Sequence, residues 1–204
     1  MTASDTYFII SSPAEGMYKE KGSKFIAIAI PVFSEDEVKE QLLNIRKKYF
    51  DARHHCYAYV LGADKKNFRS NDDGEPSGSA GKPILNQIYS AELTNILVVV
   101  VRYFGGIKLG VSGLVNAYKT AAREALQVAT IVECTEDDVY SIHFTYPLMN
   151  DVMRILKEEL LQPTLTRFEI ECYLELRCRK TQVNRVVERF SQIYGVKVNF
   201  LYSI

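Results

Sequence analysis

The sequence predicts an α+β protein of two domains, which we place at residues 1–135 and 136–204. Short runs of β-branched residues alternate with amphipathic stretches along the chain, as expected when strands and helices are mixed. The acidic segment Glu133–Asp137 separates two parts of different texture. Hydrophobic residues make up 47% of the 204 residues, which is enough for a core in each part.

The first part opens with a predicted β-hairpin over Met17–Val32, which has a Gly-Ser turn at its centre. A helix is expected to follow through about Tyr49, because Ser34–Glu37 has the pattern of a capping box. A strand over His54–Leu61 comes next.

A second strand is predicted over Asn95–Tyr103, after a polar loop at Arg69–Lys82 and a short helix over Pro83–Ala91. Its apolar run is unbroken, which predicts burial on both faces of a sheet. The run, Ile96–Val101, is far shorter than the roughly 20 residues of a membrane span. A helix with Ser112 as its N-cap is expected to follow.

The second part shows the order β-α-β-β-α-β, which is the order of a ferredoxin-like domain. Alternation of apolar and polar residues marks its first strand, where Val139, Ile142 and Phe144 are apolar. The strands are predicted over residues 138–146, 164–170, 172–178 and 196–202, and the helices over 148–161 and 181–194.

Composition excludes several functional classes. The chain has 25 Lys+Arg and 25 Asp+Glu, and this zero net charge disfavours a general polyanion binder, although a local basic patch remains compatible. The four cysteines form no C-x-x-C pair, so we expect reduced core thiols in a cytoplasmic protein. Residues 1–8 lack the basic and apolar regions of a signal peptide.

Two glycine-rich loops between Asp72 and Gly113 are the predicted working surface. Seven of the 11 glycines lie between positions 74 and 113. Glycine permits positive φ angles and close approach of another backbone. The cluster therefore indicates either tight turns that pack the fold or main-chain N–H groups on which a ligand docks.

The second loop, Arg102–Gly113, leaves a predicted strand and enters a predicted helix. Free N–H groups and the helix dipole favour anions at such a junction, and Lys108, Lys119 and Arg123 add positive charge. The loop also matches the G-x-x-x-x-G spacing of a phosphate loop. Val111 stands where that motif needs lysine, which argues against nucleotide hydrolysis.

The first loop holds three carboxylates within four residues, Asp72, Asp73 and Glu75. Such a group is able to bind Mg²⁺ or Ca²⁺, but the calcium-loop spacing is absent, so we predict no metal and no cofactor. The carboxylates equally suit capping of N–H groups or pairing with Arg53 or Arg102.

Two adjacent histidines open the predicted strand before this loop. Alternation sends His54 and His55 to opposite faces, so they are poorly placed to share one metal. A histidine–carboxylate pair with Asp72 or Asp73 suits acid–base chemistry, whereas a satisfied structural histidine is the alternative. No nucleophile motif is present, and we predict no catalytic residue.

Residues 51–59, 71–85 and 99–110 together carry the segments DARHHCYAY, NDDGEPSGSAGKPIL and VVVRYFGGIKLG. On these motifs the chain resembles the IMPACT family, in its bacterial YigZ-like branch. The resemblance implies an N-terminal βαβ fold shared with a ribosomal-protein domain and domain IV of elongation factor G, followed by a ferredoxin-like domain. It also implies a place in translation, because the eukaryotic relatives regulate translation under stress.

The predicted binding residues combine the family motifs with the basic residues of the second loop and its helix. They are Arg53, His54, His55, Asp72, Asp73, Glu75, Lys82, Arg102, Tyr103, Gly105, Gly106, Lys108, Gly110, Ser112, Lys119 and Arg123. Some or all of them equally suit a role in holding the fold together.

Three functions remain open at this point. The first is a translation-associated module whose partner is RNA, the ribosome or a translation protein. The second is an enzyme acting on a small anionic or phosphorylated substrate. The third is a protein-interaction adaptor that uses exposed tyrosines of the second domain, such as Tyr194 or Tyr202. No membrane partner is expected.

Overall fold

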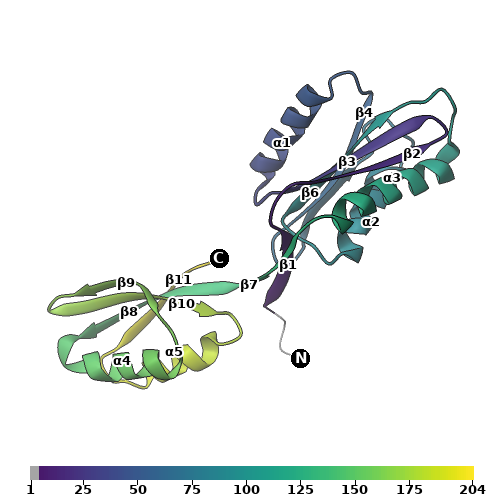
Figure 1. Ribbon diagram of the computed structural model, residues 1–204. Coiled ribbons are helices and arrows are strands. Elements are labelled where there is room, and N and C mark those ends of the chain that lie inside the picture. Colours follow the sequence, from purple (N-terminus) through teal and green to yellow (C-terminus); the bar gives the residue numbers. More distant parts are fainter. Residues whose placement is uncertain (1–4) are drawn as a thin grey trace. The chain divides into compact units, whose positions relative to one another are not determined.

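The computed structural model describes residues 5–204; residues 1–4, part of the N-terminal segment considered for a signal peptide, lie outside the described residues. The chain forms two compact units (Figure 1). The larger is Tyr7–Cys134, and the smaller is Thr135–Ile204 together with Asp5 and Thr6. Both mix helices and strands, which confirms the α+β class. Within the described part, no helix is long and apolar enough to cross a membrane.

The larger unit is built on a five-stranded sheet in the order β2-β3-β6-β4-β5, and all neighbouring strands pair antiparallel. Because β3 and β4 both flank β6, they run parallel to each other, and α1 joins them as a split βαβ crossover. The strands are β2 (Ala14–Glu20), β3 (Ser23–Pro31), β4 (His54–Leu61), β5 (Asn67–Asn71) and β6 (Ile96–Tyr103).

Helices cover both faces of this sheet (Figure 1). α1 (Glu35–Lys48) lies on one face, and α2 (Gly81–Ser90) and α3 (Gly110–Gln127) lie on the other. The side chains of β6 alternate between the two resulting cores, with Val98 in the α2–α3 core and Val99 in the α1 core. The prediction that this strand is buried on both faces is confirmed.

The capping box of α1 is present with one change of partner. Ser34 Oγ accepts a hydrogen bond from the Glu37 N–H at 3.2 Å, as expected. The Glu37 carboxylate accepts from the N–H of Phe33, at 2.8 Å, and not from that of Ser34.

Three short strands were not predicted from the sequence. β5 occupies residues that were predicted to be part of the polar loop. A polar edge strand lacks the alternation of apolar and polar residues by which strands are predicted. β1 (Thr6–Ile10) and β7 (Ile131–Thr135) form a separate two-stranded sheet, and Phe8 of β1 also forms an isolated bridge with Leu93. The predicted cap of α3 is wrong: the helix begins at Gly110, Leu109 is its N-cap residue, and no side chain caps it. Ser112 lies inside the first turn.

The smaller unit has one four-stranded antiparallel sheet in the order β11-β8-β10-β9, with β8 and β10 at its centre. Both helices lie on one face of this sheet (Figure 1). This topology confirms the predicted ferredoxin-like arrangement. The elements are β8 (Asp137–Thr145), a 3₁₀ turn (Tyr146–Leu148), α4 (Met149–Glu158), β9 (Pro163–Phe168), β10 (Glu171–Arg179), α5 (Val183–Ser191) and β11 (Lys197–Ser203).

Residue 5 is anchored within the smaller unit. The Asp5 carboxylate is buried and accepts hydrogen bonds from Arg179 at 2.7 Å and from the Thr181 hydroxyl at 2.6 Å. Hydrogen bonds from these two residues hold the pKa of Asp5 well below its usual range.

Close packing of α3 on β2 depends on Gly16. A Cβ atom at this position would lie 2.3 Å from the backbone nitrogen of Ala125, so neither backbone has room for it. We expect Gly16→Ala to lower the free energy of unfolding by about 1–3 kcal/mol, the usual cost of overpacking. Urea denaturation measures this, and Met17→Ala, at a half-exposed neighbouring position, serves as control. An unchanged midpoint for Gly16→Ala would contradict this account of the packing.

Candidate functional site

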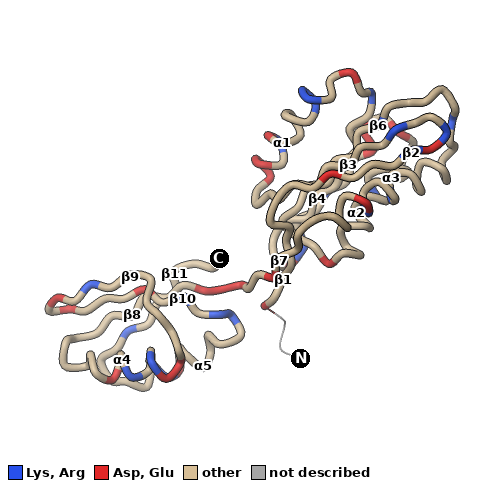
Figure 2. The backbone as a smooth tube through the Cα atoms, in the orientation of Figure 1, with Lys and Arg blue, Asp and Glu red and all other residues tan. Residues whose placement is uncertain are grey.

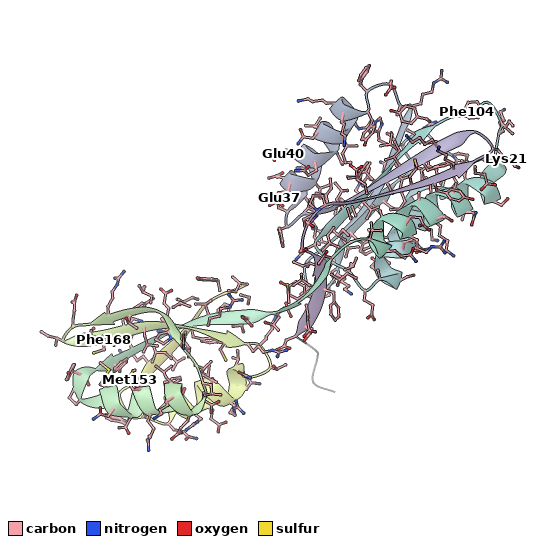
Figure 3. The ribbon with its side chains drawn as sticks, in the orientation of Figure 1. Lys21, Glu37, Glu40, Phe104, Met153 and Phe168 are labelled. Carbon is pink, nitrogen blue, oxygen red and sulfur yellow. The ribbon has the colours of Figure 1, made fainter. Side chains whose placement is uncertain are left out.

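The larger unit has a cavity of about 830 Å³ at the ends of β4 and β6. The loop after β6 and the first turn of α3 form its other walls. Phe104, which opens that loop, lies at the same end of the unit as the β2–β3 turn residue Lys21 (Figure 3). The lining residues are Asp51, Ala52, Arg53, His54, Glu75, Pro76, Arg102, Tyr103, Phe104, Lys108, Leu109, Gly110, Val111 and Leu114.

A buried network of four side chains underlies this cavity. Arg102 Nη1 donates to Glu75 Oε1 at 2.6 Å, and the Tyr118 hydroxyl donates to the same oxygen at 2.8 Å. The Cys56 thiol donates to the Tyr118 hydroxyl oxygen, with Sγ and Oη 3.3 Å apart. Burial raises the pKa of the Cys56 thiol to about 12 and raises that of Tyr118 further, so both remain neutral donors.

Arg102 also lies close to two aromatic rings. Its guanidinium carbon lies 5.5 Å from the ring centres of Phe25 and Phe104. Arg102 is 7% exposed, and its Nε has no hydrogen-bond partner among the described residues. Phe104, in contrast, is 55% exposed and offers part of its ring to solvent.

Hydrogen bonds define where the proton lies on two polar side chains at the cavity, His54 and Tyr103. His54 Nδ1 lies 2.8 Å from the carbonyl oxygen of Asp73. Because a carbonyl only accepts, Nδ1 carries the proton in the neutral ring and Nε2 is left as an acceptor. The Tyr103 hydroxyl donates to Asp51 at 2.7 Å, and this bond raises the pKa of Tyr103 to about 12. Arg53 and Lys108 are exposed, and neither forms an ion pair within residues 5–204.

Of the three first-loop carboxylates, Glu75 lines the cavity, whereas Asp72 and Asp73 bind groups of the fold outside it. Asp72 accepts three backbone hydrogen bonds at 2.8–2.9 Å, from Gly78, Ala80 and Gly81, and so occupies the anion position at the N-terminus of α2. Burial acts to raise the pKa of Asp72, but these donors outweigh it and lower the pKa. Asp73 accepts from Arg46 at 2.7 Å and from the His55 N–H at 2.6 Å.

The hypothetical acid–base pair lies apart from the cavity. His55 Nδ1 is 3.8 Å from Asp73 Oδ2, and its Nε2 is 3.1 Å from the Tyr49 carbonyl oxygen. The His55 side chain is 4% exposed, and burial is the main cause that lowers its pKa. A buried neutral ring with both nitrogens near protein oxygens is a structural histidine.

Two of the glycines serve packing. A Cβ on Gly105 would lie 1.9 Å from the carbonyl carbon of Gly22, so the second loop rests directly on the β2–β3 turn. A Cβ on Gly81 would lie 2.6 Å from the backbone nitrogen of Asn71. Gly106 and Gly110 have positive φ angles of 89° and 73° in open space, so their requirement is conformational.

The cavity therefore brings together part of the predicted binding set: Arg53, His54, Glu75, Arg102, Tyr103, Lys108 and Gly110. The others lie elsewhere in the unit: His55, Asp72, Asp73, Lys82, Gly105, Gly106, Ser112, Lys119 and Arg123. Sequence reasoning missed the apolar lining, of which Phe104 had the clearest signal as an aromatic residue inside a glycine loop. Within the described residues, no cluster of His, Cys, Asp or Glu is placed to hold a metal.

Comparison with known proteins decides the family. Residues 21–126, slightly over half the chain, match the Impact N-terminal domain. The chain belongs to the IMPACT family. Every residue that lines the cavity lies inside the matched IMPACT domain.

IMPACT relatives with curated names extend the match. IMPACT family member YvyE of Bacillus subtilis is 40% identical over 128 residues, which cover 63% of this chain and 59% of that protein. IMPACT family member YigZ of Escherichia coli is 35% identical over 154 residues, covering 74% and 76%. Protein IMPACT of Rattus norvegicus is 38% identical over 96 residues, which are 45% of this chain and 30% of that protein.

A solved structure resembles the chain over almost its whole length. The crystal structure of a hypothetical protein superposes with a TM-score of 0.70 at 28% identity, covering 97% of this chain and 98% of that one. The likeness therefore extends beyond the matched N-terminal domain.

The Asp72 cap predicts an acid-sensitive contribution to stability. Its pKa is lowered on folding, so the contribution is complete above the unfolded pKa of about 3.9 and is lost as pH falls through the folded value. We expect Asp72→Asn to destabilise the protein by about 2–3 kcal/mol at pH 7, since hydrogen bonds to a charge are replaced by weaker ones. Urea denaturation at pH 7 and near pH 3 measures both effects.

Glu40→Gln, which neutralises an exposed carboxylate on α1 (Figure 3), is the matched control and should change stability little. The difference between Asp72→Asn and the parent should shrink at the lower pH. A difference that stays constant across this range would show that the charge of Asp72 is not what stabilises the loop.

Proposed function

We propose that this chain acts in the cytoplasm as a translation-associated protein that binds single-stranded RNA at the cavity of its larger unit. The observation that carries the proposal is the half-exposed Phe104 ring beside Arg53 and Lys108, two exposed cations without ion-pair partners among the described residues. Aromatic rings that stack bases and cations that meet phosphates are the two elements of such sites.

The cavity suits one nucleotide of a flexible strand. Its volume of about 830 Å³ falls in the range of small-ligand sites. Apolar walls from Leu109, Val111 and Leu114 fit a base plane, and a base enters such a cavity only when it is unstacked. Single-stranded RNA provides unstacked bases, whereas a duplex does not.

Local charge at the cavity agrees with this ligand although the chain as a whole is neutral. Basic and acidic residues are both distributed over each unit (Figure 2). At the cavity, Arg102 is neutralised by Glu75 at 2.6 Å, while Asp51 accepts from Tyr103. Arg53 and Lys108 are the cations available to a phosphate, and they outnumber the remaining anion, Asp51.

Family membership supports the place in translation. The resemblance to IMPACT proteins implies regulation of translation, and the ribosome is the RNA-containing partner that this implies. The matched segment of the rat protein covers 30% of its length, so the proposal for this chain concerns the shared domain.

An enzyme acting on a small anionic substrate is the second candidate, because His54 lines the cavity with Nε2 as an acceptor. The carboxylates proposed as its partners do not line the cavity: Asp72 caps α2 and Asp73 binds Arg46. The two carboxylates that do line the cavity already have partners, since Glu75 binds Arg102 and Asp51 accepts from Tyr103, and this favours binding over catalysis.

The cavity proposal predicts that Arg53→Ala/Lys108→Ala weakens RNA binding. Loss of two phosphate contacts should reduce the slope of log affinity against log salt by about 1.4, at about 0.7 per contact for single strands. Phe104→Ala should weaken binding by roughly fivefold to a hundredfold, the contribution of one stacked base. Fluorescence anisotropy with a labelled single strand of about ten nucleotides measures both.

Lys39→Ala/Lys66→Ala removes two exposed cations elsewhere in the unit and is the charge-matched control. The control should bind as the parent does. Equal losses of RNA affinity in both double variants would mean that binding depends on the total charge of the protein and not on the cavity.

The exposed side of α3 gives a separate prediction. Lys119 and Arg123 lie on this helix outside the cavity, and Arg123 is 3.5 Å from Glu124. We propose that a longer strand continues along α3, so Lys119→Ala/Arg123→Ala should weaken binding of long RNA and of ribosomes in co-sedimentation, with a smaller effect on short strands. Normal ribosome binding by this variant would remove α3 from the interface.

A further inference from the structure

One row of side chains crosses the whole sheet of the smaller unit. Arg167 on β9 is the register partner of Tyr173 on β10, Tyr173 is the partner of His143 on β8, and His143 is the partner of Lys197 on β11. Across the sheet, the row therefore consists of a cation, two aromatic rings and a second cation. Since neighbouring strands lie about 4.8 Å apart, it spans about 14 Å.

This row lies on the face of the sheet opposite α4 and α5. Residues that alternate with Tyr173 along β10, such as Cys172 and Leu174, are buried in the core that includes Val152 of α4 and Phe190 of α5. Tyr173 therefore points to the other face. Figure 1 shows α4 and α5 on one side of this sheet, so neither of these helices covers the row.

The two aromatic rings form one ordered group. The ring centres of His143 and Tyr173 are 4.9 Å apart with an angle of 74° between their planes. The Arg167 guanidinium lies 5.9 Å from the Tyr173 ring centre. The Tyr173 hydroxyl donates to Glu175 at 2.6 Å, which fixes the ring without an external partner.

The cations at the two ends of the row are available to bind phosphate groups. Neither Arg167 nor Lys197 forms an ion pair within the described part of the chain, and Lys197 is exposed. A second cleft of about 410 Å³ begins at the same row. Its lining residues are His143, Phe144, Thr145, Glu171, Gly195, Lys197 and Asn199.

We propose that this sheet face is a second binding site for single-stranded RNA. Four-stranded sheets of this kind stack two or three bases on aromatic side chains of their strands, and arginine planes act in the same way. Here the aromatic pair lies on the two central strands. Arg167 and Lys197 flank it, where they meet the phosphates on either side of the stacked bases.

Two carboxylates share the face and restrict how the strand lies. Glu175 already accepts from Tyr173, and Glu171 lines the cleft beside Lys197. Glu175 repels phosphates from the middle of the row, and Glu171 restricts the path of the backbone at the end where Lys197 lies. Glu171 is also able to accept hydrogen bonds from base amino groups, as carboxylates do in nucleic-acid sites.

This site is independent of the cavity in the larger unit, and the experiment separates the two. The full chain carrying Phe104→Ala/Lys108→Ala serves as background, so that the remaining affinity for a labelled single-stranded RNA of about ten nucleotides reports the sheet. In this background we expect Tyr173→Ala to weaken binding by roughly fivefold to a hundredfold. Arg167→Ala/Lys197→Ala should reduce the salt slope by about 1.4.

Arg154→Ala/Lys157→Ala on α4 is the control, since it removes two exposed cations from the opposite side of the smaller unit. The control should bind as the background does, and a double-stranded RNA of equal length should bind more weakly than the single strand. The proposal is overturned if the background chain binds no RNA, or if the sheet and control variants lose equal RNA affinity. It is also overturned if Arg167→Ala/Lys197→Ala leaves RNA binding intact and abolishes only the binding of an acidic peptide. Far-ultraviolet circular dichroism verifies that each variant is folded.

Discussion

The buried ion pair between Arg102 and Glu75 connects the two glycine-rich loops. Arg102 is the penultimate residue of β6 and Glu75 lies in the loop after β5, so their contact at 2.6 Å holds the two loops together. Both side chains are almost fully buried, and removal of one partner from such a pair typically costs about 3–5 kcal/mol, because the other charge stays buried. Tyr118 adds a second donor to Glu75, which ties α3 to the same point.

This constraint explains why the motif residues divide into two groups. Asp72, Asp73 and Gly81 build the loop, since they bind backbone groups, Arg46 and the strand beside them. With the loop held in this way, His54 and Arg53 lie at an open cavity beside Phe104. The binding surface thus depends on neighbouring residues of the same motifs that never reach it.

Much of the fold could be predicted, because the decisive elements carry strong periodic signals. The apolar run of β6 and the element order of the smaller unit are visible in sequence, as is the capping box of α1. β1, β5 and β7 could not be predicted, because short strands at sheet edges or in pairs carry no clear alternation. The N-terminus of α3 was missed because the positive φ of Gly110, and not a capping side chain, sets where the helix begins.

The candidate site was less predictable, since it depends on contacts between distant residues. The glycine loops and the basic character of Lys108 were apparent. That Asp72 binds the N-terminus of α2, six to nine residues further along, could not be read from spacing alone, because turn geometry decides which N–H groups converge on it. Phe104 could not be assigned to the cavity from sequence, because spacing does not tell whether an aromatic residue in a loop is buried or half exposed.

The anchoring of Asp5 has a consequence for how the smaller unit is isolated. The chain passes from this unit to the larger one after Thr6 and returns at Thr135, so the smaller unit is discontinuous in sequence. A fragment that starts at residue 136 lacks the carboxylate that Arg179 and Thr181 bind. Fusion of the N-terminal strand segment to such a fragment, by a linker or by circular permutation, restores that partner and is the rational route to studying the ferredoxin-like unit by itself.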